Sequence, residues 1–188
     1  MTLTPTLTSP SDLLCKLARE QYRAFHSEHL IHKADHLYNF CITALAIKDF
    51  VLEHLKITDT SKKQAYYATW AKVPELVAAT EIANSSKHLT LRDGKQRQKH
   101  AKTKSVKASS SSVVDVYIDK NGDLHTIKKD NVPDYNIELG NCTILQVWEF
   151  TIAVLHYWEN YFKNSSIPYY KQTENEYFGV VDNIEQSR

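Results

Sequence analysis

The chain has 188 residues, of which 42% are hydrophobic and 24% charged, and its formal net charge is +1. These values exclude a disordered chain, and they exclude a protein whose overall electric field draws in nucleic acid or a membrane, so any such attraction has to be local. The four glycines form no phosphate-binding or dinucleotide-binding motif.

The cysteines and the apolar runs predict a cytoplasmic protein. The three cysteines lie far apart in the sequence, at Cys15, Cys41 and Cys142. We therefore expect buried free thiols in a reducing compartment. No signal peptide is visible at the amino terminus, and no run of about 18 apolar residues is present, so we expect no contact with a membrane.

The first two predicted helices belong to one domain, residues 1–188, with its core at about 10–164. Residues 9–12 are typical of a helix start because Ser9 can cap the helix and Asp12 can complete a capping box. Apolar residues then recur at helical spacing as far as Phe25. Residues 32–56 predict a second helix, whose apolar stripe is broad enough for a central place in the core.

Two shorter helices and a loop follow. A helix is predicted after the break at residues 58–61, ending near Trp70. A fourth helix begins at Pro74, which suits a first helical turn, and runs to about His88. Residues 92–112 are basic and then serine-rich, offer nothing to a core, and predict a mobile loop.

Residues 113–129 predict a β-hairpin. Asn121-Gly122 is favoured in two-residue hairpin turns because both residues tolerate positive φ. Pairing outward from this turn sets Asp115 opposite Lys128 and Val116 opposite Ile127, which places Ile127 on one apolar face with Val116. An isolated hairpin is marginally stable, so we expect this face to pack on helices.

Residues 141–164 predict a long helix rich in aromatic residues, which we expect to lie against the helix at 32–56. The tail at 165–188 is polar, yet it is aromatic enough to dock on the domain. The predicted fold class is therefore mainly α, a bundle of about five helices with one β-hairpin inserted before the last long helix.

Four segments, in this order, resemble a known family. They are residues 38–50, residues 81–88, the hairpin, and the helix containing Val147 to Trp158. The string Ala-Asn-x-x-Lys-His at 83–88 is the most specific of them. Over roughly residues 32–163 the chain resembles the HEPN-like helical domains of bacteria and their mobile elements. The resemblance implies a homodimer without metal or other cofactor, acting on RNA or an operon-encoded protein partner in phage defence or a toxin–antitoxin pair.

The resemblance also points to candidate catalytic residues. Ribonucleases of this family carry an arginine that steadies the phosphate and, after four to six intervening positions, a histidine that transfers protons. Asn84 and His88 match the polar residue after the arginine and the histidine, whereas Ala83 stands at the arginine position. Lys87 is the nearest cation, but on a helix it points about 100° away from His88. We expect a catalytically degenerate copy, or a helix end at which Asn84 and His88 serve only as caps.

A second set of candidates lies in the predicted loop. Its basic residues could hold phosphates without sequence preference, and no aromatic residue among them could stack on bases. They are Arg92, Lys95, Arg97, Lys99, Lys102, Lys104 and Lys107.

Other patterns on the first helices are weaker. Arg19 to His26 and Arg23 to His29 have spacings that fit the ribonuclease motif, but they lie outside the family position, and we interpret them as chance. The histidines near the start of the second helix lack the third ligand and the supporting groups of a zinc site. They are His26, His29, His32 and His36.

Three classes of function remain open. The preferred one is a degenerate HEPN-like module that binds RNA or a protein. The others are an active ribonuclease that uses His88 with an unconventional cation, and a purely structural or regulatory helical interaction domain.

Overall fold

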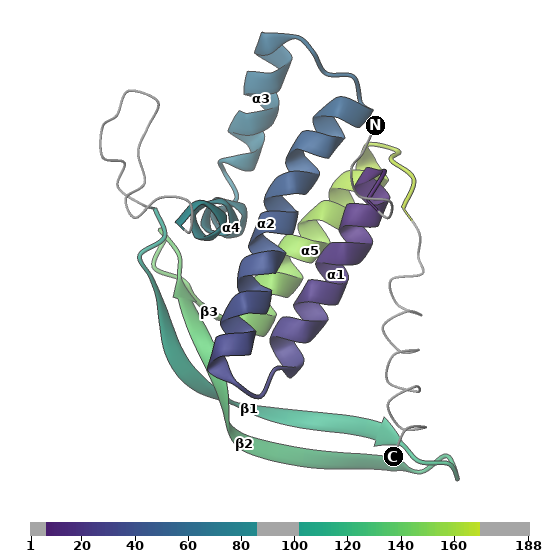
Figure 1. The fold of residues 1–188 in the computed structure, drawn as a ribbon, viewed down its shortest axis with the longest axis vertical. Helices are drawn as coiled ribbons and strands as arrows, with labels where there is room; N and C mark the ends of the chain where they lie inside the picture. The colour runs from purple at the N-terminus through teal and green to yellow at the C-terminus, as the bar shows by residue number, and fades with distance from the viewer. Residues whose placement is uncertain (1–6, 86–101, 170–188) are drawn as a thin grey trace.

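The structure is a computed structural model that describes residues 7–85 and 102–169. Within these ranges, four helices are followed by three strands and a fifth helix (Figure 1). The fold is therefore mainly α with an antiparallel sheet. The sheet is larger than the predicted hairpin, because its strands are longer and a third strand joins them in the order β1-β2-β3. No helix in the described part of the chain is long and apolar enough to cross a membrane.

Helices α1 (Pro10–His26) and α2 (Leu30–His54) pack side by side. The predicted capping box of α1 is confirmed, since the Asp12 backbone N–H donates to the Ser9 hydroxyl and the Ser9 N–H donates to the Asp12 carboxylate. The two helices are also joined through the buried Glu20. Its carboxylate lies 3.3 Å from Lys16, 3.2 Å from Arg23 and 3.1 Å from His36 of α2.

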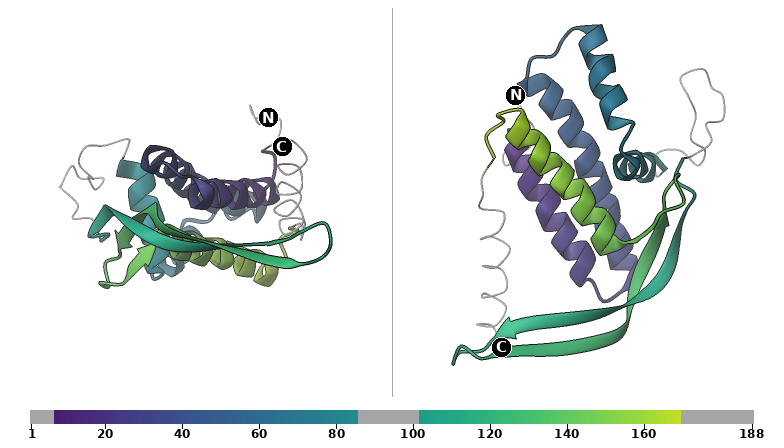
Figure 2. Two further views of the ribbon diagram at one scale, coloured as in Figure 1. Left: turned by 90° about the horizontal axis from the view of Figure 1, so that it is seen from below. Right: turned by 180° about the vertical axis from the view of Figure 1, so that it is seen from behind.

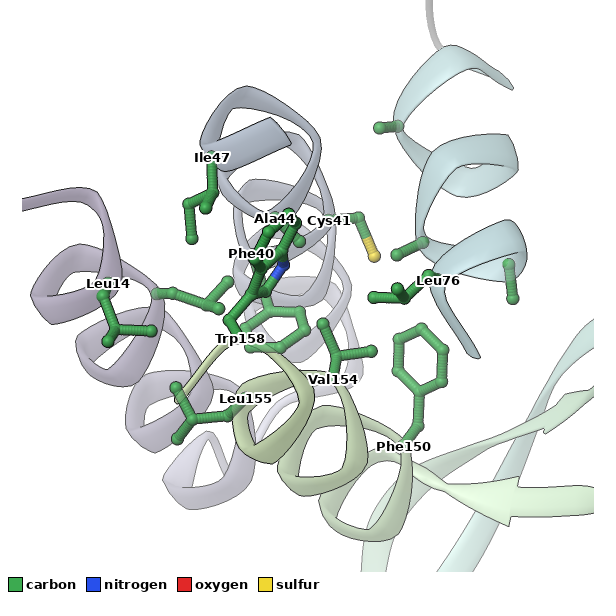
Figure 3. Packing of buried hydrophobic residues seen from close by; sticks show 14 of the residues in the cluster. Leu14, Phe40, Cys41, Ala44, Ile47, Leu76, Phe150, Val154, Leu155 and Trp158 are labelled. Carbon is green, nitrogen blue, oxygen red and sulfur yellow. The ribbon is translucent and has the colours of Figure 1, made fainter. Parts of the chain in front are cut away.

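The remaining helices are α3 (Thr60–Trp70), α4 (Pro74–Ser85) and α5 (Val147–Asn164). Figures 1 and 2 show α5 alongside α1 and α2, with α4 crossing near one end of the sheet. The prediction that α2 and α5 share the core is confirmed by the contact of Phe40 with Phe150, whose ring centroids lie 6.4 Å apart. Trp158 fills the space between α1, α2 and α5 (Figure 3).

The described start of the tail docks as expected. Ile167 is buried, and the carbonyl of Pro168 accepts a hydrogen bond from the Ser11 hydroxyl at the start of α1. The rest of the tail lies outside the described residues. The prediction of buried thiols holds for Cys41 and is wrong for Cys142, which is exposed in the turn before β3.

The sheet consists of β1 (Ser105–Ile118), β2 (Leu124–Glu138) and β3 (Ile144–Gln146). The prediction of a mobile loop over 92–112 is wrong for residues 105–112, which form the first half of β1. The backbone of this stretch pairs with residues 132–138 of β2, which satisfies its hydrogen-bonding groups. As an edge strand it exposes much of its surface, so its serines need no place in the core.

The predicted hairpin register is wrong by one residue. The Asp119 N–H donates to the Asp123 carbonyl, which closes a three-residue loop, and Gly122 has a φ of +89° within it. This is the three-residue turn with glycine in the left-handed region, and Asn-Gly suits it as well as it suits the two-residue turn. Val116 therefore pairs with Thr126, and Ile127 pairs with Asp115 on the opposite face.

The strand pair bends where its ladder is interrupted between Ser111 and Val113. At this bend Asn131 has a φ of +58°, and the Ser112 hydroxyl donates to the Asp130 carboxylate at 2.7 Å. Beyond it, residues 113–129, here called the arm, pass below the ends of α1 and α2 in the view of Figure 1. The prediction that the apolar face of the hairpin packs on helices is wrong for the described residues, because that face of the arm is exposed.

A buried ion pair fixes the bend to the helices. The ammonium of Lys33, in the first turn of α2, lies 3.6 Å from the carboxylate of Asp134 in β2 and donates to the Phe25 carbonyl at 3.2 Å. The Tyr135 hydroxyl also donates to the Leu30 carbonyl at 3.1 Å. The connection between α1 and α2 therefore holds β2 in place.

Candidate nucleic-acid interface

The residues that the sequence nominated fall into two groups. Lys87, His88, Arg92, Lys95, Arg97 and Lys99 lie outside the described residues. Of the rest, Asn84 is half-buried on the last turn of α4. Ala83, which occupies the arginine position of the resembling family, is only 1% exposed and belongs to the hydrophobic core.

Glu81 holds the chain where it returns to α4. Its buried carboxylate accepts hydrogen bonds from the backbone N–H of Lys102 at 2.9 Å and of Thr103 at 2.7 Å. These hydrogen bonds to the Glu81 carboxylate hold Lys102 against α4, which ends at Ser85.

Lys102 and Lys104, which were both predicted to contact phosphate, differ in their surroundings. The Lys104 ammonium lies 3.4 Å from the Glu138 carboxylate and 2.9 Å from the Cys142 sulfur. The hydrogen bond with Cys142 and then that with Glu138 raise the pKa of Lys104. Its charge is thus partly neutralised by Glu138. Lys102 forms no ion pair among the described residues.

Two adjoining hollows open beside Lys102. The first, of about 190 Å³, is lined by side chains of α2, α3 and α4, among them Lys48, Tyr67 and Thr80. The second, of about 140 Å³, lies between the α3–α4 turn and the base of the sheet, and Lys72 lines it. Both hollows are bordered by Lys102, Ala71 and Val77. Lysines from three separate segments therefore line two hollows that share a border at Lys102.

Lys48 has an unusual place within this group. Its ammonium lies 4.8 Å from the ring centroid of Tyr67 and 4.4 Å from that of Trp70. Burial lowers the pKa of Lys48, and the nearby Asp49 opposes that shift. Within the described ranges, none of Lys48, Lys72 and Lys102 forms a salt bridge with a carboxylate.

Sequence reasoning missed most of this surface. It nominated Lys102 but not Lys48, Tyr67 or Lys72, which are far from it in the sequence and look like ordinary surface residues. It also found no aromatic residue near the basic stretch, whereas the packing of α3 places the half-exposed Tyr67 beside Lys102. No local pattern signals this arrangement, because tertiary packing alone produces it.

The histidines of α1 and α2 are spread over separate contacts. His36 contacts Glu20, the His26 ring lies tilted against Tyr22 with centroids 4.1 Å apart, and His29 meets His32 edge-on at 5.6 Å. Over the ranges that the structure describes, no group of three potential ligands could hold a metal ion.

The comparisons with known proteins add no assignment. The chain matches no family model, no curated protein and no solved structure.

Proposed function

We propose that the chain is a HEPN-like module that binds RNA without cleaving it, through the two hollows beside Lys102 together with the basic residues 92–99. The observation that carries the proposal is that Lys48, Lys72 and Lys102, none of them paired with a carboxylate within the described residues, line two adjoining hollows, the larger of which also contains the half-exposed Tyr67. The setting in phage defence or a toxin–antitoxin pair is part of this proposal through the family resemblance.

The chemistry of the hollows favours single-stranded RNA. Lysines that contact phosphates gain affinity by releasing counterions, and a neighbouring aromatic ring adds stacking that tolerates any base. Each hollow is small and open, which suits one phosphate or one unpaired base better than a duplex. Glu81 also lines the larger hollow, but its carboxylate already accepts two backbone N–H groups, which offset part of its charge.

The test compares two triple variants of equal charge. Lys48→Gln/Lys72→Gln/Lys102→Gln removes the cluster, while Lys56→Gln/Lys62→Gln/Lys163→Gln removes exposed lysines elsewhere. Binding of a labelled single-stranded RNA is followed by fluorescence anisotropy over a range of salt concentrations. We expect the cluster variant to bind at least about tenfold more weakly. The slope of log affinity against log salt concentration should fall by the equivalent of about two phosphate contacts, each of which contributes about 0.7 on single strands.

Two results would contradict the proposal. Equal losses in both triple variants would mean that only net charge matters. Absence of binding by the native chain would remove RNA as the ligand. Tyr67→Leu separates stacking from charge, because it should weaken binding about fivefold or more while leaving the salt dependence unchanged.

A further inference from the structure

We propose that the two hollows beside Lys102 recognise the phosphorylated end of an RNA strand. The smaller hollow holds a terminal phosphate monoester, and the larger one holds the nucleoside that carries it. This inference rests on the proposed function, because it names the part of the RNA that the same hollows take. A free nucleoside monophosphate has the same chemistry and is therefore the second probe of the test.

The smaller hollow, of about 140 Å³, lies at the amino-terminal end of α4. Pro74, the first residue of α4, lines it. The residue before it, Val73, has no side-chain acceptor, so it cannot cap the first N–H groups of the helix. These N–H groups and the helix dipole favour an anion at this position.

Side-chain donors on two other segments line the same hollow. Lys72 belongs to the turn between α3 and α4, whereas Lys102 and Thr103 come from the residues before β1. The buried hydroxyl oxygen of Thr103 has no hydrogen-bond partner among the described residues. No carboxylate lines this hollow, and Glu75 of the first turn of α4 lines neither of the two. One anion would therefore be met by two ammonium groups, a hydroxyl and a helix start.

The larger hollow, of about 190 Å³, suits a nucleoside. The half-exposed ring of Tyr67 in its lining can stack on a base. Trp70 also lines it and is only 6% exposed, and its indole N–H has no hydrogen-bond partner among the described residues. Because a buried donor without an acceptor costs free energy, a ribose or base oxygen bound here would gain from accepting this N–H.

The cations of the smaller hollow favour a terminal phosphate over one within a strand. A phosphate monoester carries about 1.5 to 2 negative charges at pH 7 and three acceptor oxygens. A phosphodiester within a strand carries a single charge and fewer free oxygens. Lys72 and Lys102 line one small hollow together with the start of α4, so the more highly charged group gains more there.

The first experiment compares ends of one single-stranded RNA by fluorescence anisotropy with an internal label. The strand carries a 5′-phosphate, a 3′-phosphate or hydroxyls only, and a hydroxyl-ended strand two nucleotides longer matches the added charge. One phosphorylated strand should bind about tenfold more tightly than both hydroxyl-ended strands, the factor of an ordinary charge-assisted contact. Equal binding of all four strands would overturn this inference and leave the proposed function standing.

Single variants locate the phosphate. Lys72→Gln, which changes only the smaller hollow, should bring the ratio of affinities for phosphate-ended and hydroxyl-ended RNA close to one. Lys48→Gln, which changes only the larger hollow, should weaken both affinities and keep their ratio. Lys163→Gln is the control, because Lys163 is exposed on α5, and it should behave like the native chain. Lower affinities with an unchanged ratio in Lys72→Gln would exclude the smaller hollow as the phosphate site.

Calorimetry with adenosine 5′-monophosphate and adenosine gives an answer that does not depend on RNA. The nucleotide should bind about tenfold more tightly than the nucleoside, for the same reason. Binding of the nucleotide without binding of any RNA would refute the proposed function and keep the phosphate site, with a free nucleotide as its ligand. A preference for phosphate-ended RNA without binding of the nucleotide would identify the strand end as the ligand. No preference for phosphate with either probe would overturn the inference.

Discussion

At the scale of single residues, the ion pair Lys33–Asp134 connects the sheet to the helices. Both side chains are almost fully buried, and their contact joins the start of α2 to the bend of the hairpin. Removing one partner of a buried pair leaves the other charge without compensation, which costs about 3–5 kcal/mol. Lys33→Met should therefore lower the free energy of unfolding by about that amount, as measured by urea denaturation.

The double variant decides whether the charge is the cause. Lys33→Met/Asp134→Leu should recover most of the lost stability, because it leaves no buried charge. The exposed pair of Lys128 and Asp130 is the control, and Lys128→Met should change stability by at most about 1 kcal/mol. A double variant as unstable as the sum of its single changes would show that packing, rather than charge, dominates at this position.

At the scale of elements, the helices were largely predictable from sequence and the strands only in part. The prediction of a last helix over 141–164 is wrong at its start, because residues 144–146 form β3 and the helix begins at Val147. Capping residues and apolar periodicity are local signals, so the predicted starts at Pro10 and Pro74 agree with the structure. The hairpin turn was located, but Asn121-Gly122 fits two loop lengths, and only the pairing of whole strands selects one. The serines at 109–112 were predicted to lie in a loop, because a strand that exposes most of its side chains shows no alternation of apolar and polar residues.

Two glycines provide a prediction at the same scale. A Cβ at Gly122 would meet nothing within 4 Å, but its φ of +89° is unfavourable for other residues by about 1 kcal/mol or more. Gly140 is the opposite case, because a Cβ there would lie 2.6 Å from the Lys102 carbonyl oxygen. Gly122→Ala should therefore loosen only the arm, whereas Gly140→Ala should displace Lys102.

Hydrogen exchange and RNA binding separate these two effects. We expect faster amide exchange within residues 113–129 for Gly122→Ala, with unchanged RNA affinity. For Gly140→Ala we expect faster exchange at Lys102 and Thr103 and weaker RNA binding. Unchanged RNA affinity in Gly140→Ala would argue that the position of Lys102 does not matter for binding.

At the scale of the whole molecule, the candidate site could be predicted only where it is local in sequence. The basic stretch was visible, but Lys48 and Tyr67 reach Lys102 through the packing of α2, α3 and α4, which no spacing rule encodes. The same packing bears on catalysis. Position 83, where ribonucleases of the resembling family carry arginine, faces the core here, so the bundle uses it for packing.

This arrangement predicts that the chain does not cleave RNA. Phosphodiester cleavage needs both proton transfer, for which His88 is the candidate, and stabilisation of developing negative charge, which Ala83 does not supply. Loss of such an electrostatic group typically lowers the rate by about 10²–10³. Incubated with structured and single-stranded RNA, the native chain and His88→Ala should both leave the RNA intact.

Ala83→Arg gives the same prediction a second readout. If the position only lacked its arginine, this substitution would create a ribonuclease. Because Ala83 is buried among apolar side chains, we expect instead a loss of helical circular dichroism and no activity, since an unpaired buried charge is strongly destabilising. Robust cleavage by the native chain that disappears in His88→Ala would contradict this view and restore the active ribonuclease. Intact RNA without measurable binding would direct the search toward a protein partner, because the lysine hollows would then lack their proposed ligand.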